Sequence, residues 1–513
     1  MNKKIVSDLK KMIDVNTPII YIDDYDFTRI DFLLFEALGT ETDILEWSPA
    51  LGMQRVFIDD GYLARENYST GIDKTLDVIL KDYLDKYKTN KPIYLVLKDV
   101  HGLLDDISIK SLVQMIAQRK LYDLDFDVTL IINSSIINVP KEIEKYVSFL
   151  DIPFPSDEEI RYLIKEHVET NHYEDFHDNV IDKLMPSLKG MTLFEIDRML
   201  DMAMSSGGTL KDEDKDMILR HKKQMVKKSG VLELVDSPES LDSIGGLENL
   251  KKYLTSKSKV IKDIGKAIKA GVAVPKGVFI VGMPGCGKSL CAKATAALFE
   301  CPLLQLDMGS LMGKYLGESE KNLRQAIKIA EAVAPCVLWI DEIEKAFTGV
   351  GESEVLTRMF GHLLLWLQEK TSSVYVLATS NNANNLPPEL KRKGRFDEIF
   401  CVNLPTYDER EKIFNVHLKK RKDKGAKVSD SLWKDGKFSV PKKLIDATEG
   451  FNGADIESVI NEAVSDCFIN EQELSEDILL EKAKETVSIS KSCKKQIEEM
   501  EKIFKDSNFK NAS

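Results

Sequence analysis

The chain has 513 residues, of which 43% are hydrophobic and 30% charged, and these proportions are typical of a folded globular protein of about two to four domains. Its net charge of −13 lies within residues 1–235, and an acidic half argues against non-specific binding of nucleic acids or anionic membranes. Seven cysteines without a C-x-x-C pair exclude a disulfide framework, and no apolar run approaches the ~18 residues of a membrane span, so we expect a cytoplasmic protein.

Three apolar segments of the first half are typical of buried strands in a parallel sheet, within residues 17–38, 91–104 and 127–155. The second segment ends in Lys98 and Asp99, at the point where such strands present carboxylates to a nucleotide site. A lysine at this point would repel a metal ion. The pattern therefore indicates either a nucleotide-binding architecture without its metal chemistry or a chance likeness.

Residues 276–299 predict a strand, a glycine-rich loop and a helix. The loop GMPGCGKS matches the phosphate-loop pattern G-x-x-x-x-G-K-[ST], in which backbone N–H groups and a helix N-terminus surround phosphate oxygens. Lys288 is placed to reach the β- and γ-phosphates, and Ser289 is placed to ligate Mg²⁺. We expect nucleotide contacts throughout this segment, from Gly282, Pro284, Gly285, Cys286, Gly287, Lys288, Ser289 and Leu290.

Residues 334–347 predict a fully apolar strand that ends in Asp341 and Glu342. Ligands of open α/β sheets bind at the carboxyl ends of the strands, so we expect Asp341 to hold Mg²⁺ through its hydration shell. Glu342 is placed to polarise the attacking water. The alternative is a strand that merely ends in surface acids, and the phosphate loop upstream argues against it.

A further buried strand within residues 373–400 ends at Asn381. A neutral amide at this position orients water against the γ-phosphate without adding charge. Arg392 and Arg395 follow in a short polar turn, and a guanidinium supplied to a transferring phosphate contributes roughly 10³–10⁵ in rate. We therefore expect Asn381, Arg392 and Arg395 to act in catalysis with Glu342.

This set of motifs resembles the classical clade of the AAA+ ATPases from residue 236 to about residue 470. The segments DSIGGLENLKKYL (242–254), LPTYDEREKIFNVHL (404–418) and ATEGFNGADIESVINEA (447–463) are similar to the adenine-side segment and the lid helices of that clade. The resemblance implies ATP and Mg²⁺ as ligands. It assigns further nucleotide contacts to Ile244, Gly245, His417, Gly453 and Ala454.

The chain departs from the family pattern at Ser243, where aspartate is usual, and in a long basic insert, 419–443. In the family the paired arginines act on the ATP of the neighbouring subunit, which implies a homo-oligomeric ring, usually a hexamer. The resemblance also covers a pore loop with which AAA unfoldases grip extended polypeptide, matched here by Lys314, Tyr315, Leu316 and Gly317. A turn with a half-buried tyrosine is the alternative for this loop.

The first half aligns in order with the second. The segment YLVLKDVHGLL (94–104) matches VLWIDEIEKAF (337–347), with Lys98 in the place of Asp341, and Asn133 resembles Asn381. The phosphate loop and the paired arginines have no counterpart in the first half. We interpret this half as a degenerate AAA-like domain, with an unrelated α/β domain as the alternative. The arrangement resembles AAA proteins encoded in algal plastids and cyanobacteria.

The expected fold is therefore α/β: a P-loop AAA+ parallel-sheet core with a helical lid, preceded by a degenerate AAA-like α/β domain. The expected domains are the degenerate domain at 1–210, a linker at 211–240, the large ATPase domain at 241–403, the lid at 404–470 and a charged helical tail at 471–513. We expect the last ten residues to fray, as chain ends often do.

The expected activity is ATP hydrolysis, used by a ring-forming motor that remodels or unfolds a protein substrate through its pore loop. The alternative is an ATP-dependent assembly switch or scaffold, whose acidic first domain recruits a partner without threading it. A nucleic-acid motor is disfavoured because no basic, aromatic groove is evident in the sequence. We expect neither nucleic acid nor membrane as a partner, and the sequence does not identify the protein substrate or adaptor.

Overall fold

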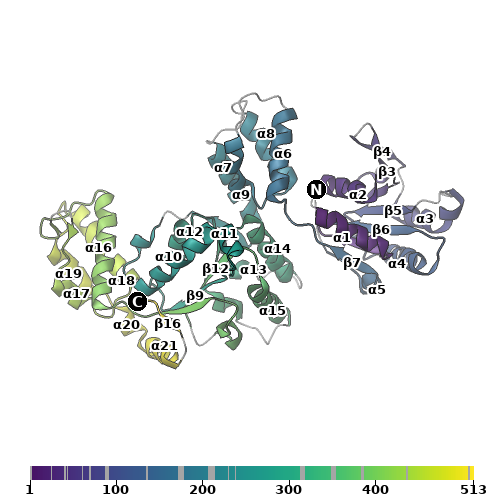
Figure 1. The fold of residues 1–513 in the computed structure, drawn as a ribbon. Helices are drawn as coiled ribbons and strands as arrows, with labels where there is room; N and C mark the ends of the chain where they lie inside the picture. The colour runs from purple at the N-terminus through teal and green to yellow at the C-terminus, as the bar shows by residue number, and fades with distance from the viewer. Residues whose placement is uncertain are drawn as a thin grey trace. The chain divides into compact units, whose positions relative to one another are not determined.

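The computed structural model of the chain divides into two compact units, Met1–Ile218 and Leu219–Ser513 (Figure 1). It describes residues 3–24, 26–39, 42, 44–59, 62–68, 71–86, 92–134, 137–170, 178–205, 214–228, 230–236, 239–311, 318–347, 354–382, 386–434, 437–506 and 509–513. None of the helices in these ranges has both the length and the apolar character needed to cross a membrane.

The first unit is built on a sheet of seven described strands in the order β4-β3-β2-β5-β6-β1-β7. All neighbours from β2 to β7 in this order pair in parallel, and β3 and β4 extend one edge as antiparallel strands. The elements in chain order are α1 (Lys3–Asp14), β1 (Ile19–Ile22), α2 (Phe27–Leu38), β2 (Ile44–Ser48), β3 (Gly52–Asp59), β4 (Tyr62–Asn67), α3 (Ile72–Lys86), β5 (Ile93–Lys98), α4 (Ile107–Tyr122), β6 (Val128–Asn133), α5 (Lys141–Glu144), β7 (Val147–Leu150), α6 (Asp157–Thr170), α7 (Asp178–Leu188) and α8 (Leu193–Ser205).

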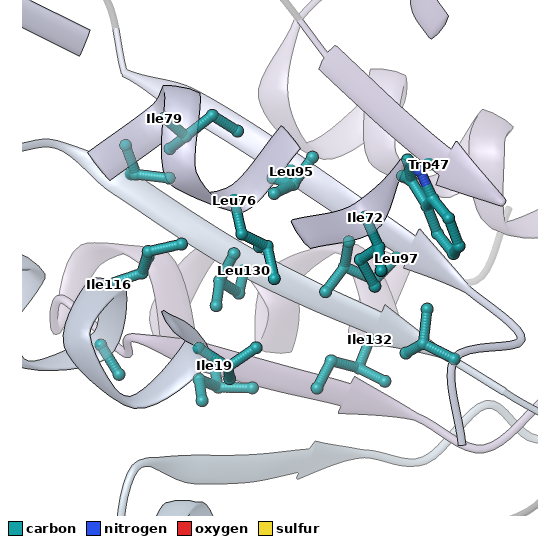
Figure 2. Packing of buried hydrophobic residues seen from close by; sticks show 14 of the residues in the cluster. Ile19, Trp47, Ile72, Leu76, Ile79, Leu95, Leu97, Ile116, Leu130 and Ile132 are labelled. Carbon is teal, nitrogen blue, oxygen red and sulfur yellow. The ribbon is translucent and has the colours of Figure 1, made fainter. Parts of the chain in front are cut away.

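Both faces of this first sheet are buried, which explains why its parallel strands are continuous apolar runs. Successive strand residues point to opposite faces, so Ile19 belongs to one hydrophobic cluster and its neighbour Ile20 to another. Figure 2 shows the first cluster, in which side chains of β5, β6 and β1 pack against α3 and α4; it includes Ile19, Leu76, Ile79, Leu95, Leu97, Ile116, Leu130 and Ile132. The other face packs against α1 and α2.

The second unit contains another sheet of seven described strands, in the order β16-β13-β9-β12-β11-β10-β8, all parallel to their neighbours except β8. The elements in chain order are α9 (Asp214–Lys228), which crosses the boundary between the units, β8 (Leu232–Val235), η1 (Leu241–Ser243), α10 (Glu248–Lys262), α11 (Ile264–Lys269), β9 (Gly277–Gly282), α12 (Lys288–Phe299), β10 (Leu303–Leu306), α13 (Met308–Leu311), α14 (Glu318–Val333), β11 (Cys336–Ile340), η2 (Ile343–Phe347), α15 (Glu354–Glu369), β12 (Val374–Ser380), η3 (Pro388–Lys391), β13 (Glu398–Val402), α16 (Tyr407–Asp423), β14 (Trp433–Lys434), β15 (Lys437–Phe438), α17 (Lys442–Ala447), α18 (Gly453–Ile469), α19 (Glu476–Glu485), α20 (Ile489–Ser492), α21 (Lys494–Asp506) and β16 (Lys510–Asn511).

Five parallel strands have the same order in the two sheets: β7-β1-β6-β5-β2 in the first unit and β13-β9-β12-β11-β10 in the second. The equivalent strands β5 and β11 are each followed by an acidic residue in the left-handed conformation, Asp99 with φ 52° and Glu342 with φ 47°. Few non-glycine residues adopt this conformation. The shared feature supports the equivalence of Lys98 with Asp341.

The sequence suggested that Asn133 is the counterpart of Asn381, but the strand register shows that it is not. In the first sheet Asn133 pairs directly with Lys98, whereas in the second Ile340 pairs with Ala378. The residue level with Asp341 is therefore Thr379, and Asn381 lies beyond it. The Asn133 side chain has a structural contact instead, because its amide donates to the Asp24 carbonyl at 2.9 Å.

Lys98 is the centre of a buried ion cluster. Its ammonium lies 2.9 Å from an oxygen of Asp31 on α2 and 2.8 Å from an oxygen of Glu46 on β2, and all three residues are at most 4% exposed. Arg65 on β4 contacts the second Asp31 oxygen at 2.5 Å. Burial raises the pKa of Asp31, and the charge of Lys98 opposes that rise. An ammonium group thus occupies the position at which the second unit has the carboxylate of Asp341.

Two chain segments differ from their predicted structure. The segment 211–240, expected to be a linker, contains α9 and β8, and β8 is an edge strand paired with β10. The expected tail contains α19, which packs on the lid helices α17 and α18, and it ends in β16, which pairs with β13. The prediction that the last ten residues fray is wrong for 509–513, because Ala512 is fully buried.

Candidate active site

The phosphate loop connects the carboxyl end of β9 to the first turn of α12. Gly285 and Gly287 adopt left-handed conformations with φ 74° and 82°, which glycine reaches without strain. The Lys288 ammonium is buried and donates hydrogen bonds to the carbonyls of Gly282 and Met283, both at 2.7 Å. Burial lowers the pKa of Lys288. The loop thus presents backbone N–H groups and a lysine to one side of a cavity.

Asp341 and Glu342 follow β11 at the same edge of the sheet. The hydroxyl of Thr379 on β12 donates to a carboxylate oxygen of Asp341 and accepts from the Glu342 backbone N–H, the latter at 3.1 Å. The left-handed backbone at Glu342 turns the chain between these two contacts. Thr379, fully buried, therefore fixes the orientation of both acidic residues.

Glu342 has two side-chain partners, Asn381 and Lys345. The Asn381 amide donates to Glu342 Oε1 at 2.6 Å, and Lys345 forms an ion pair with Oε2. The hydrogen bonds from Lys345 and then Asn381 lower the pKa of Glu342, despite its partial burial. Glu342 is therefore ionised at neutral pH and is oriented by a neutral amide, as general-base chemistry requires.

A cavity of about 760 Å³ brings most of the predicted site residues together. Its lining contains the predicted residues Ile244, Gly245, Pro284, Gly285, Cys286, Gly287, Lys288, Ser289, Leu290, Asp341, Glu342, Asn381, His417, Gly453 and Ala454. Gly282 is not in the lining; it ends β9, and a Cβ on it would lie 2.5 Å from the Val402 carbonyl oxygen. The elements that meet here are the phosphate loop, the acidic end of β11 and the lid.

The sequence of the chain is similar to that of a known protein family. Residues 278–404 match the model of the ATPase family associated with various cellular activities (AAA), residues 5–152 match that of the N-terminal domain of SpoVK-like AAA ATPases, and residues 158–229 match their second domain. The AAA domain-containing protein ycf46 of Guillardia theta is 34% identical over 501 residues, which cover 97% of this chain and 94% of that one. The chain belongs to the AAA ATPase family.

Other AAA ATPases match different lengths of the chain. The ycf46 protein of Pyropia yezoensis is 30% identical over 517 residues and 99% of both chains. The proteasome-activating nucleotidase of Methanosarcina mazei is 29% identical over 275 residues, which cover 52% of this chain and 63% of that protein. The similarity to the ycf46 proteins therefore includes the first unit.

The paired arginines of this AAA ATPase are not part of the cavity lining of their own chain. Arg392 is exposed directly after η3, and the Arg395 guanidinium donates to the Glu389 carbonyl within the same turn. Neither residue is among the described residues around the cavity. The predicted pore loop, Lys314–Gly317, lies outside the described residues.

The wall of the cavity at which the sequence predicts the base, called here the base side, is formed where the segment after η1 meets the lid helix α16. A Cβ on Gly245 would lie 2.5 Å from Ile413 Cγ1, so the two segments are in close contact only because residue 245 is glycine. His417 lies near Glu457, with Nδ1 3.8 Å from Oε1, and burial lowers the pKa of the imidazole. Burial thus favours the neutral form of the imidazole.

Three residues that organise the site in this AAA ATPase were missed from the sequence: Thr379, Glu409 and Asn452. Glu409 and Asn452 belong to capping boxes, the Thr406–Glu409 pair on α16 and the Asn452–Asp455 pair on α18. The S/T-x-x-E pattern of the first was readable in the sequence as a helix start. Glu409 and Asn452 each make a further contact with a segment that is distant in sequence, and the capping pattern alone could not predict these contacts.

Proposed function

We propose that this AAA ATPase is a ring-forming motor that couples ATP hydrolysis to the remodelling of a protein substrate. The observation that carries the proposal is the position of Arg392 and Arg395. Both arginines lie outside the cavity of their own chain, while Glu342 and Asn381 are already joined inside it. A neighbouring copy of the chain would complete the site by supplying the guanidinium groups. The similarity to a proteasome-activating nucleotidase supports a role in protein handling.

The residues of the cavity divide the chemistry of hydrolysis among them. The phosphate loop and Lys288 bind the triphosphate, and Glu342, oriented by Asn381, takes a proton from the attacking water. Ser289 and Asp341 line the same cavity, and Thr379 orients one Asp341 oxygen, so the pair fits a hard cation with oxygen ligands. They would hold Mg²⁺, which when bound neutralises charge on the phosphates.

Mixing two inactive variants tests the shared site. Arg395→Ala subunits retain Glu342 and lack the guanidinium, whereas Glu342→Gln subunits retain the guanidinium and lack the base. We expect each variant alone to be inactive and the mixture to recover part of the ATPase activity, because some mixed interfaces contain one complete site. Lys505→Ala, an exposed change on α21, is the control and should hydrolyse ATP like the unaltered chain.

The specific ATPase activity of the unaltered chain should also rise with protein concentration as rings assemble. Concentration-independent turnover by a persistent monomer, together with no recovery in the mixture, would contradict the ring. Sedimentation of the same samples with and without ATP links the activity to the oligomeric state.

A second experiment separates the motor from an assembly switch. In Tyr315→Ala we expect most basal ATP hydrolysis to remain and unfolding of a model protein substrate to be lost, because only a threading motor needs an aromatic grip. Unfolding can be followed by the loss of fluorescence of a fused fluorescent domain. Retained unfolding by Tyr315→Ala would contradict the predicted grip of Tyr315, and ATP hydrolysis without any unfolding by the unaltered chain would favour the switch.

A further inference from the structure

Residues 509–513 lie at the edge of the ATPase sheet (Figure 1), beside β13, whose last residue, Val402, lines the cavity. The strand β16 pairs in parallel with β13, and the Ala512 N–H donates to the Cys401 carbonyl at 3.0 Å. Ala512 is fully buried in the hydrophobic cluster that also contains Ile244, Leu247 and Leu250. This segment is therefore part of the folded core.

The carbonyl of Ala512 caps a helix from far away in the sequence. Helix α10 begins after Leu247, which has a left-handed backbone with φ 57° and a side chain that forms no cap. The N–H groups of Asn249 and Leu250 donate to the Ala512 carbonyl at 3.0 and 3.1 Å. They are the second and third residues of the helix, whose N–H groups an N-cap side chain normally satisfies. The Ala512 carbonyl takes the place of that side chain.

The start of α10 is also tied to the lid. The Leu247 N–H donates to Glu409 Oε1 at 3.1 Å, and the other oxygen of Glu409 accepts from the Thr406 N–H at 3.0 Å. Burial raises the pKa of Glu409, but hydrogen bonds from Thr406, Ser513 and Leu247 outweigh it and leave the pKa lowered. Gly246 lies directly against the same carboxylate, because a Cβ at this position would lie 2.5 Å from Glu409 Oε1.

We propose that residues 509–513 are a positioning element for the base side of the ATP cavity. By capping α10 and contacting Glu409, they hold the segment 244–247 against the lid, and Ile244, Gly245, Leu247 and Glu409 all line the cavity. The inference rests on the proposed nucleotide site. Three strands, β13, β9 and β12, separate β16 from β11, after which Glu342 follows. We therefore expect the docking of the segment to set the affinity for nucleotide and to leave the chemical step unchanged. By linkage, bound nucleotide strengthens the docking by the same factor.

The variant Ala512→Asp tests the proposal, because a carboxylate in the apolar position of Ala512 displaces the segment. We expect the Kd for ADP, measured by calorimetry, and the KM for ATP to rise at least about fivefold, the lower end of typical coupling, with kcat unchanged. Asn511→Asp is the matched control, since it places the same carboxylate one residue earlier on an exposed side chain.

Hydrogen exchange on the unaltered chain tests the reciprocal effect and does not depend on the folding of any variant. Saturating ADP should slow exchange at the N–H groups of Asn249, Leu250 and Ala512. Unchanged exchange on ADP binding, or a folded Ala512→Asp variant with the unaltered Kd, would overturn the inference. Lys288→Ala separates the two levels. If Lys288→Ala loses ADP binding and Ala512→Asp retains it, only the positioning role of residues 509–513 is refuted. If Lys288→Ala binds ADP normally, the proposed nucleotide site itself is refuted.

Discussion

Lys288 and Glu342 line the same cavity but have different predicted roles. Substitutions at the two positions should therefore impair different steps, ATP binding and ATP hydrolysis. Lys288→Ala removes a buried ammonium from the phosphate loop, so we expect the loss of ATP binding. Glu342→Gln retains the shape and the hydrogen bond to Asn381 but cannot accept a proton. We expect it to bind ATP and not to hydrolyse it. Calorimetry and phosphate release measure the two effects, and equal loss of ATP binding in both variants would refute the division of roles.

The ion cluster at Lys98 predicts a large effect on stability. Lys98→Met leaves the carboxylates of Asp31 and Glu46 buried without their ammonium partner, and breaking a buried pair in this way typically costs about 3–5 kcal/mol. The matched control is Lys110→Met, because the Lys110–Glu142 pair is partly exposed, and exposed ion pairs contribute little to stability. Denaturant unfolding, fitted separately for the transition of the first unit, measures both.

Adding Asp31→Asn to Lys98→Met should restore part of the lost stability, since one buried charge is then removed. If Lys98→Met unfolds at the denaturant concentration of the unaltered chain, the cluster does not stabilise the first unit.

At the scale of elements, the lid helix α18 is coupled to the phosphate loop through its N-cap. The Asn452 side chain accepts from the Asp455 N–H at 2.7 Å and donates to the Pro284 carbonyl at 2.9 Å. Asn452→Ala should cost about 0.5–2 kcal/mol and weaken ATP binding, because both contacts are lost. Asn452→Asp retains a good cap, but its carboxylate faces the Pro284 carbonyl, so we expect near-normal stability with weaker ATP binding.

Thermal unfolding and calorimetry distinguish these two outcomes. Ser475→Ala is the control, since Ser475 stands at the N-cap of α19 without forming a cap hydrogen bond. Normal ATP affinity in Asn452→Asp would show that the contact between lid and loop is energetically neutral.

The elements that sequence could predict are those whose signal is local. The phosphate loop, the apolar run of β11 and the residues that follow it depend on patterns within about ten residues, and the structure places them around one cavity. The strand β16 has two residues and no periodicity, so its place at the sheet edge depends on pairing with β13 more than 100 residues away. The sequence could not predict the contacts of Glu409 and Thr379 either, because each of these residues contacts a segment that is distant in sequence.

At the scale of the whole molecule, the chain contains two similar sheets, of which we expect only the second to carry a nucleotide site. The first unit lacks the glycine-rich loop, and the ammonium of Lys98 takes the place of a carboxylate. We expect the 513-residue chain to bind one ATP, and Lys288→Ala to show no saturable binding. Without a ring of backbone N–H groups, a single ammonium contributes too little, because even millimolar affinity needs about 4 kcal/mol. The number of ATP molecules bound per chain can be measured by calorimetry. Saturable ATP binding by Lys288→Ala would contradict the expectation.

The Lys98 cluster also bears on whether evolution could restore the first site. Reverting Lys98 to aspartate would bring a third carboxylate beside Asp31 and Glu46, and the three buried negative charges would repel one another before any metal ion arrived. This single change therefore gives a less stable protein unless a compensating change at Asp31 or Glu46 comes first. The ion cluster thus stabilises the architecture of the first unit and at the same time disfavours a metal-binding carboxylate at position 98.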